Sequence, residues 1–295
     1  MKLTYLRIGS SALLMALAVS CAPLGQQQAP APSSSTSADA TATRDGNLAL
    51  GNPSGATTDA TNSPNNYLLT KSQYTLSYSR DQGKPNWVSW HLSTAWLGST
   101  GRQDNFAADA TLPSGWYRPG STSYSGSGFD RGHNCPSADR TGSVADNSAT
   151  FLMSNMMPQA PNNNQQTWAN LENYCRTLAN AGNELYIIAG SYGRGGTGTN
   201  GTVSTIDGGR ITVPSNCWKV IVVLPVGTSD ASRITSSTRV IAINTPNTNS
   251  INTSWGSYRT TVDAIENATG YNLLSAVSST IQSSLESRVD TGPTN

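Results

Sequence analysis

The sequence predicts an α+β fold in which helices flank a mostly antiparallel central sheet, because two different periodicities occur along the chain. Several short segments alternate apolar and polar residues or consist of β-branched residues, as strands do. Two longer segments place apolar residues three and four positions apart, which is the spacing of one helix face. All 7 Trp, all 3 Phe and 10 of the 11 Tyr lie beyond residue 66. About 225 residues can therefore form one hydrophobic core.

Five segments are predicted to be strands. Alternation of apolar and polar residues indicates half-buried strands over 74–78 and 87–92. Short β-branched runs between Gly, Pro or Asn indicate sheet strands over 185–189, 220–224 and 240–243. The glycine-rich segment 190–201 lacks the Gly-Lys-Ser/Thr ending of a phosphate-binding loop, so we expect a mobile hairpin connection there.

Two segments are predicted to be helices. Pro161 precedes residues 162–182 and Gly182 ends them, which are good start and stop signals. The apolar stripe expected to hold this helix on the sheet consists of Leu171, Cys175 and Leu178. A second stripe predicts a closing helix near the C-terminus and consists of Leu274, Val277, Ile281 and Leu285.

Residues 1–22 have the pattern of an export signal. Lys2 and Arg7 precede an apolar run over 11–19 that is too short to span a bilayer as a stable helix. The residues up to Cys21 resemble a bacterial lipobox, although Leu17 lies four places before the cysteine instead of three. We expect an exported protein that is extracellular, periplasmic or lipid-anchored at the cell envelope. Either Cys21 carries the lipid and anchors the protein to the membrane, or ordinary cleavage occurs near Ala22.

Residues 23–66 consist mainly of Gln, Ala, Pro, Ser, Thr, Asn and Gly, with almost no group to bury. Such a segment cannot offset its ordering entropy, so it is predicted to be a disordered low-complexity tether. The folded domain is then expected over 67–290, followed by a tail at 291–295. No stretch after the export signal is apolar and long enough to cross a membrane.

The formal net charge of +1 argues neither for nor against a polyanionic partner, so any anion-binding surface must be local. A first candidate is the segment 128–142, which reads GFDRGHNCPSADRTG. Arg131 offers a fork of donors for phosphate, and His133 can take up a proton near neutral pH. Gly132 between them allows a backbone or a ligand to come close. A basic surface turn would have the same residues, so both alternatives stay open for this stretch alone.

A second candidate lies along the predicted helix 162–182. Asn164, Trp168, Glu172 and Arg176 follow one another at steps of four, so they lie near one helix face. Two structural explanations produce the same pattern, namely an ion pair between Glu172 and Arg176 and a helix cap by Asn164.

Together the two segments supply a specific chemistry. The oxygens of an Asn carbonyl and a Glu carboxylate suit Mg²⁺, which usually takes the rest of its shell from water and substrate phosphate. A nearby His can take a proton from an attacking water. Arginines can hold the non-bridging phosphate oxygens and the charge that develops in the transition state. These are the groups needed to hydrolyse a phosphodiester with one metal ion.

Three ordered blocks resemble the DNA/RNA non-specific endonuclease family, which has a ββα-metal (His-Me finger) site, and most closely its secreted bacterial branch. The first block is DRGH at 130–133, followed by Pro136 and by Ala-Asp-Arg at 138–140. The second is NMMPQ at 155–159, and the third runs from NQQTW at 164–168 to Leu-Glu at 171–172. The resemblance extends from about residue 67 to about residue 290 and implies the ββα-metal motif within the predicted fold.

The resemblance implies which residues activate water and bind the metal. His133 would be the general base. Asn164 would be the direct protein ligand of Mg²⁺, or of Mn²⁺ as a substitute. Glu172 would hold the metal through a water molecule and assist near the leaving group.

The resemblance also implies phosphate contacts and supporting residues. Arg102, in the block GRQDNF at 101–106, would stabilise the pentacovalent phosphate. Arg131 and Arg176 would contact phosphate. Asp130 and Asn155 would support the site through hydrogen bonds without binding the metal themselves.

The remaining histidine and tryptophan of interest have structural interpretations. His91 lies in an alternating strand context and is expected at an edge or in the core. Trp168 is expected in the core, with base stacking as the alternative. Two histidines exclude a multi-His zinc site, and the absence of a Gly-x-Ser-x-Gly segment argues against a Ser-His-Asp triad.

Three cysteines remain if Cys21 carries a lipid. In an oxidising compartment at most one disulfide can form among Cys135, Cys175 and Cys217, and the sequence does not select the pair. A bridge at Cys135 would brace the turn that carries His133.

The predicted function is hydrolysis of DNA and RNA without sequence specificity, because contacts to phosphate and metal carry no sequence information. The resemblance further implies products with 5′-phosphates. Two alternatives stay open: a metal-dependent phosphodiesterase with another substrate, and a non-catalytic nucleic-acid-binding surface lipoprotein. Related exported nucleases meet a dedicated protein inhibitor, although this sequence shows none. The sequence does not indicate the oligomeric state or the preferred metal.

Overall fold

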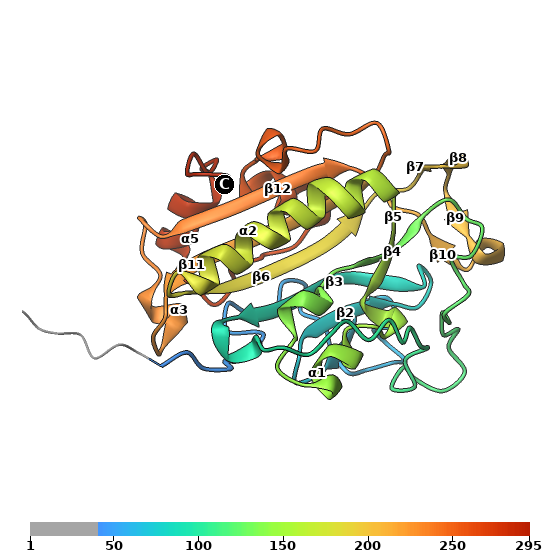
Figure 1. The fold of residues 1–295 in the computed structure, drawn as a ribbon, viewed down its shortest axis with the longest axis horizontal. Helices are drawn as coiled ribbons and strands as arrows, with labels where there is room; N and C mark the ends of the chain where they lie inside the picture. The colour runs from blue at the N-terminus through green and yellow to red at the C-terminus, as the bar shows by residue number, and fades with distance from the viewer. Residues whose placement is uncertain (1–40) are drawn as a thin grey trace, which may run out of the picture. The chain divides into compact units, whose positions relative to one another are not determined.

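The computed structural model describes residues 41–295. Its centre is a six-stranded antiparallel sheet with the strand order β1-β2-β3-β6-β11-β12 (Figure 1). The strands are β1 (Tyr67–Thr70), β2 (Thr75–Ser79), β3 (Lys84–Leu92), β6 (Asn183–Tyr192), β11 (Asn216–Pro225) and β12 (Arg239–Pro246). The prediction of an α+β fold with an antiparallel central sheet is confirmed, and each of the five predicted strands overlaps a strand of this sheet.

Smaller elements complete the fold. Three two-stranded ladders pair β4 (Asp130–His133) with β5 (Met156–Gln159), β7 (Gly196–Gly198) with β8 (Gly201–Val203), and β9 (Thr205–Ile206) with β10 (Ile211–Thr212). The α-helices are α1 (Val144–Ala149), α2 (Ala169–Asn180), α3 (Asp230–Arg233), α4 (Val262–Thr269) and α5 (Ser279–Glu286). A π-helix, η4 (Asn163–Trp168), precedes α2. The hairpin expected within 190–201 corresponds to β7 and β8.

Helix α2 lies across one face of the sheet (Figure 1). Leu171 and Cys175 are buried there with Trp90, Ile187 and Ile221 from three strands. Helices α4 and α5 cover the opposite face, where their apolar side chains pack on the alternate residues of the same strands. The apolar stripe predicted for α2 is therefore confirmed, and the sheet forms the middle layer of three.

The predicted C-terminal helix is shorter than its apolar stripe. Leu274 and Val277 are buried in the same cluster as Leu285, but they lie in the turn before α5. Ser278 has an extended backbone, with φ −60° and ψ 141°, so the helix begins only at Ser279. Spacing predicted which side chains are buried, but it placed the start of the helix too early.

The strands β2 and β3 are buried on both faces, whereas alternation predicted half-buried strands. The segment 45–66 covers their polar face. Ser89 Oγ donates a hydrogen bond to the Asn47 carbonyl at 2.6 Å, and Asn86 Nδ2 donates to the Asn65 carbonyl at 2.7 Å. Polar residues on these strands therefore contact protein, not solvent.

The packed part of the chain accordingly begins before Tyr67, where the tether was expected to end. Leu50 and Ala56 are 3% and 4% exposed. The composition of this segment offers little apolar surface, but its backbone and amide groups form hydrogen bonds with the polar strand face. Residues 23–40 of the expected tether lie outside the described residues, as do the export signal and Cys21.

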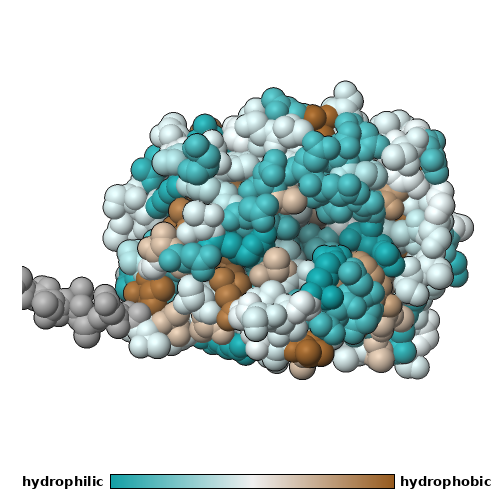
Figure 2. Space-filling view, viewed as in Figure 1, coloured by the Kyte–Doolittle hydropathy of each residue, from teal (hydrophilic) through white to brown (hydrophobic). Residues whose placement is uncertain are grey.

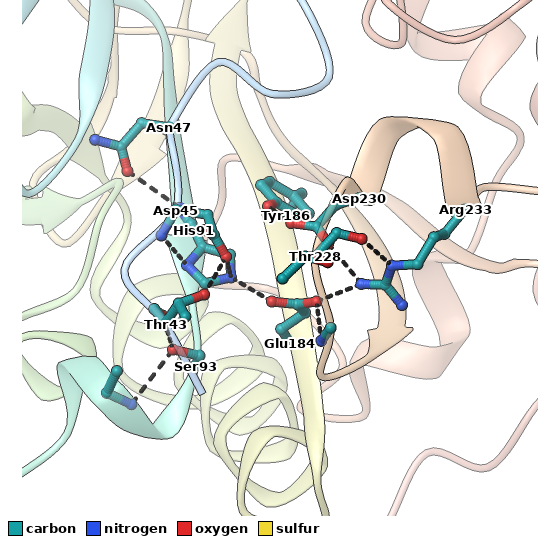
Figure 3. A network of polar contacts seen from close by, with 12 residues as sticks. Thr43, Asp45, Asn47, His91, Ser93, Glu184, Tyr186, Thr228, Asp230 and Arg233 are labelled. Atoms are coloured by element: carbon teal, nitrogen blue, oxygen red, sulfur yellow. Dashed lines mark hydrogen bonds and ion pairs between the residues drawn. The ribbon is translucent and has the colours of Figure 1, made fainter. Parts of the chain in front are cut away.

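His91 belongs to a buried polar network that fastens the N-terminal segment to the sheet (Figure 3). Its Nδ1 accepts a hydrogen bond from the Asp45 backbone N–H at 3.3 Å, and its Nε2 lies 3.1 Å from Glu184 Oε2. Because Nδ1 is the acceptor, Nε2 carries the proton and donates it to the carboxylate. No ring lone pair is then left for a metal ion, and the core position predicted for His91 is confirmed.

The three cysteines within the described residues are all free and buried. Among residues 41–295 no disulfide braces the turn at Cys135. Burial raises the pKa of each thiol to about 12, so these side chains act as small apolar groups of the core.

No helix among residues 41–295 has the length and apolar character needed to span a bilayer. On the face shown in Figure 2 the surface is mainly hydrophilic, and hydrophobic residues form small separate patches. That face has the character of an ordinary solvent-exposed surface.

Candidate active site

Strands β4 and β5 and the helix that follows them bring the predicted motifs together. β4 pairs antiparallel with β5, so that Gly132 lies opposite Met157 and His133 opposite Met156. A Cβ atom at position 132 would collide with the side chain of Gln159 on β5, which explains the glycine. After β5 the chain enters η4 and continues as α2. The DRGH segment thus forms the first strand of a strand–strand–helix unit.

The helix predicted over 162–182 begins with a π-helical turn instead of a regular one. Asn164 lies within η4, whereas Glu172 and Arg176 lie in α2. Trp168, at the junction, is 1% exposed, and its Nε1 donates a hydrogen bond to the His133 carbonyl at 3.3 Å. The core position predicted for Trp168 is confirmed. π-Helical turns are frequent at functional sites, where they change the direction of side chains.

A cleft of about 370 Å³ opens beside this unit. Four of the eight predicted site residues line it, namely Arg102, Asp130, Arg131 and Asn164. The loop at 121–125 and the aromatic ring of Phe106 form other parts of its wall. Two guanidinium groups therefore face the same cleft as an amide and a carboxylate.

The side chain of Asn164 is oriented by Asp130. Asn164 Nδ2 donates to Asp130 Oδ2 at 2.8 Å, and Gln165 Nε2 donates to the same oxygen at 2.8 Å. The amide nitrogen of Asn164 is thereby committed, and no hydrogen bond within the described residues uses its carbonyl oxygen. A hard oxygen ligand in a polar cleft suits Mg²⁺ or Mn²⁺, so these residues fit the metal that the sequence predicts.

His133 lies next to the cleft and packs between aromatic rings. It is 8% exposed, and the rings of Phe106 and Phe151 lie edge-on to it with centroids at 5.6 and 5.0 Å. Its Nε2 is buried and has no hydrogen-bond partner. A buried nitrogen without a partner is costly for stability, which indicates a functional use for its lone pair.

The surroundings of His133 keep the imidazole neutral. Burial lowers its pKa to about 3, and the positive charges of Arg102 and Arg131 act in the same direction. A hydrogen bond to the backbone of Arg131 opposes this shift. At neutral pH the ring is therefore an unprotonated base.

The two arginines of the cleft are stacked on the same phenylalanines. The Arg131 guanidinium lies 3.7 Å from the Phe106 centroid, and that of Arg102 lies 4.8 Å from the Phe151 centroid. Arg102 also pairs with Asp104 at 2.7 Å, and half of its side chain remains exposed. Stacking fixes both cations beside His133 and leaves their outer N–H groups available for an anion.

Asn155 holds the turn that follows His133. Its Oδ1 accepts from the Cys135 N–H at 3.0 Å, and its Nδ2 donates to the carbonyls of Cys135 and Thr150. All of these groups are buried, so the bonds fix the backbone at the end of β4. This is the supporting geometry that the sequence predicts for Asn155.

Glu172 and Arg176 do not line the cleft. Glu172 Oε1 lies 3.2 Å from Lys219 Nζ on β11. Burial raises the pKa of Glu172, while Lys219 and Arg176 oppose the increase. Arg176 pairs with the buried Asp139 at 2.7 Å. This pair holds the guanidinium against the protein, and the structure does not bring it to the position expected of a phosphate contact.

The sequence did not predict a role for four residues of this region: Phe106, Phe151, Gln165 and Lys219. Lys219 had a signal, because it is the one charged residue of the apolar run CWKVIVVL at 217–224. Gln165 is adjacent to Asn164 in sequence. No sequence signal indicated a role for the two phenylalanines, since their contacts with the arginines depend on the path of the loops.

Comparison with known proteins agrees with this architecture. The sequence profile described as DNA/RNA non-specific endonuclease matches residues 52–280. A nuclease of Nostoc sp. is 50% identical over 279 residues, which cover 95% of this chain and 96% of that protein. Human mitochondrial endonuclease G is 30% identical over 166 residues, covering 54% of this chain and 56% of that protein.

The fold has a counterpart among solved structures. The crystal structure of the EndoG/EndoGI complex contains a chain with a TM-score of 0.62 and 22% identity, which covers 79% of this chain and 91% of that one. The profile match spans most of the chain, and the Nostoc nuclease matches almost all of it. The chain therefore belongs to the DNA/RNA non-specific endonuclease family and is a nuclease.

Proposed function

We propose that this nuclease hydrolyses phosphodiester bonds of both DNA and RNA with one Mg²⁺ and with His133 as the general base. Nucleases of this family are metal-dependent. The observation that carries the proposal is that Asn164 and two stacked arginines line one cleft, and that the unpaired Nε2 of His133 lies behind the Phe106 ring of its wall. Mn²⁺ is the expected substitute metal, because it accepts the same oxygen ligands.

Asn164 would hold the metal through its carbonyl oxygen. The bond to Asp130 occupies the amide nitrogen, which would leave the carbonyl oxygen for the cation. When bound, Mg²⁺ would supply positive charge to neutralise the phosphate and the leaving oxygen.

His133 would take the proton of the attacking water. Its neutral ring presents Nε2, which accepts that proton while the water oxygen forms a bond to phosphorus and the bond to the leaving sugar oxygen breaks. The rings of Phe106 and Phe151 hold the imidazole in place. Binding of the negative substrate raises the basicity of His133, because it offsets the charges of Arg102 and Arg131.

Arg102 and Arg131 would bind the non-bridging phosphate oxygens. Both are held by aromatic stacking before substrate arrives, so little ordering entropy is lost when the phosphate binds. Glu172 follows Asn164 by eight residues, about two helical turns, and its ion pair with Lys219 fixes the carboxylate on that side of α2. The resemblance assigns it a contact with the metal through water and help near the leaving group, whereas its carboxylate pairs with Lys219 and is not among the groups that line the cleft.

Lack of sequence preference follows from contacts of this kind, since phosphate and metal contacts do not read base edges. The same contacts do not read the sugar. We therefore expect cleavage of single- and double-stranded DNA and of RNA.

The test is an assay of residues 41–295 on plasmid DNA and on RNA, with Mg²⁺ and with EDTA. Asn164→Ala and His133→Ala should each reduce kcat/KM by about 10²–10⁴ on both substrates. Asn170→Ala is the matched control, because Asn170 is exposed on α2 and its side chain donates a hydrogen bond to the Thr253 carbonyl, away from the cleft residues. Full activity of His133→Ala, or undiminished cleavage in EDTA, would refute the proposed mechanism.

Export and inhibition complete the proposal. We expect the mature chain outside the cytoplasm, which fractionation of producing cells with Cys21→Ser as comparison would test. Loss of membrane association in this variant would support a lipid anchor.

A protein inhibitor is a separate expectation, since EndoG is inhibited in the EndoG/EndoGI complex. If such an inhibitor exists for this nuclease, cytosolic extract should inhibit plasmid cleavage, and protease treatment of the extract should abolish the inhibition.

A further inference from the structure

Three carboxylates meet between α4 and α5, on the sheet face opposite α2. Asp263 and Glu266 lie on α4, and Glu286 is the last residue of α5. One carboxylate oxygen of each lies within 4.8 Å of the other two. Oxygens that bind the same Ca²⁺ at about 2.4 Å lie at most about 4.8 Å apart, and these three carboxylates meet that condition.

Within the part of the chain that the structure describes, these carboxylates have no cationic partner. None of the salt bridges among residues 41–295 includes Asp263, Glu266 or Glu286. Glu286 is 6% exposed, and its Oε1 is buried without a hydrogen-bond partner. One oxygen of Glu266 accepts the Leu273 N–H at 2.7 Å. A buried carboxylate oxygen without a partner points to a ligand that has yet to bind.

Two further features make the arrangement unfavourable without a counter-charge. Glu286 lies at the C-terminal end of α5, where the helix dipole is negative and an acidic side chain is disfavoured. The carboxylates also repel one another when charged, because their oxygens lie within 4.8 Å of one another.

We propose that Asp263, Glu266 and Glu286 bind a divalent cation, Ca²⁺, which joins α4 to α5. The oxygen-only donor set excludes a preference for zinc, which favours His and Cys. Mg²⁺ demands near-ideal octahedral geometry, whereas Ca²⁺ accepts irregular sets of carboxylates from flexible elements. None of the three residues lines the cleft at Asn164. A cation bound there would therefore stabilise the outer layer formed by α4 and α5, and it would not take part in phosphodiester hydrolysis.

The test measures Ca²⁺ binding by calorimetry at pH 8 in an Asn164→Ala background of the chain from residue 41, so that the catalytic cleft does not contribute. One Ca²⁺ per chain should bind. Glu286→Gln should weaken binding at least tenfold, since it removes one of three charged ligands. Asp81→Asn is the control of equal charge change, because Asp81 is an exposed carboxylate that pairs with Arg80. The Asp81→Asn variant should bind Ca²⁺ as tightly as the parent.

Thermal unfolding gives a readout that does not depend on activity. Ca²⁺ at about 100 times its Kd should raise the Tm by about 5–10 °C, and Glu286→Gln should abolish this rise. Asp263→Asn is a second variant at a half-buried position, and it should also lose the response. If the parent shows no Ca²⁺ binding, or if binding persists in Glu286→Gln, the proposal is overturned.

Discussion

Asp130 on β4 accepts a hydrogen bond from Asn164 on η4 at 2.8 Å, across 34 residues of sequence. This contact joins the DRGH segment to the helical segment that carries the candidate metal ligand. It occupies the amide nitrogen of Asn164 and so determines which atom the side chain offers to the cleft. The aspartate of the motif would therefore position the proposed ligand.

Replacement of Asp130 by Ala should weaken the metal site and leave the fold intact. The amide of Asn164 would lose its fixed orientation, so the Mg²⁺ concentration for half-maximal activity should rise about 10–100-fold. The measurement is plasmid cleavage as a function of Mg²⁺ concentration. Asp81→Ala removes an exposed carboxylate and should leave the curve unchanged. An unaltered Mg²⁺ dependence in Asp130→Ala would exclude this positioning role.

Acid should destabilise the protein through His133. Its pKa is about 3 in the folded state against an ordinary value of 6.5. Between these values the unfolded chain binds the proton and the folded one does not. The stabilisation that comes from this pKa difference is therefore fully present above about pH 6.5, and it is lost as the pH falls toward 3.

At pH 4.5 about 3 kcal/mol of this stabilisation should be lost, since two pKa units separate this pH from the ordinary value. Urea unfolding of the parent at pH 7.5 and 4.5 should show this loss in excess of His133→Ala, which cannot titrate there. Equal losses in parent and variant would contradict the neutral, buried state of His133.

The sequence predicted the part of the site that depends on local motifs. Residues 130–133 and 156–159 pair as neighbouring strands, and the helix follows directly, so Asp130, Arg131 and Asn164 meet through short-range geometry. Arg102 could be assigned only through the resemblance, because its loop reaches the cleft by contacts with Ser137 and Phe151. Such long-range contacts leave no periodicity in the sequence.

Helical spacing was a weaker guide to function. Arg176 follows Glu172 by one turn, yet Asp139 holds its guanidinium at 2.7 Å. Asp139 lies far away in the sequence and also accepts from Trp90 Nε1 at 3.0 Å. The partner that decides the role of an arginine is thus a tertiary contact, which spacing along one helix does not reveal.

The ion pair between Lys219 and Glu172 should be important for stability because its lysine is 1% exposed. Lys219→Met would leave Glu172 with a buried charge opposed only by Arg176 at longer range. The expected loss is about 3–5 kcal/mol. Lys219→Met combined with Glu172→Leu should recover much of it, since both charges are then removed.

Urea unfolding checks this prediction, with the exposed pair as control. Arg80→Met breaks the Arg80–Asp81 contact, in which both side chains are about half exposed, and should cost less than about 1 kcal/mol. Equal effects of Lys219→Met and Arg80→Met would show that burial does not strengthen the inner pair.

The segment 45–66 should be required for the stability of the sheet. Composition predicted disorder there, because the segment has few apolar residues. Its amides instead satisfy the polar face of β2 and β3, and Leu50 is 3% exposed among Val220 and its neighbours. The family profile also begins at residue 52, before the expected domain boundary.

Leu50→Ala should therefore cost about 2–5 kcal/mol, as for other buried leucines. Val144→Ala is the control, because Val144 is 59% exposed and should change stability by less than about 0.5 kcal/mol. Deletion of residues 41–66 should have a larger effect, since it uncovers Ser77, Ser89 and Asn86 together with the apolar residues beside them. Urea midpoints of 41–295 and 67–295 provide the comparison. If the shorter chain unfolds at the same urea concentration with the same slope, this segment contributes nothing to the fold and the expected boundary at residue 67 is restored.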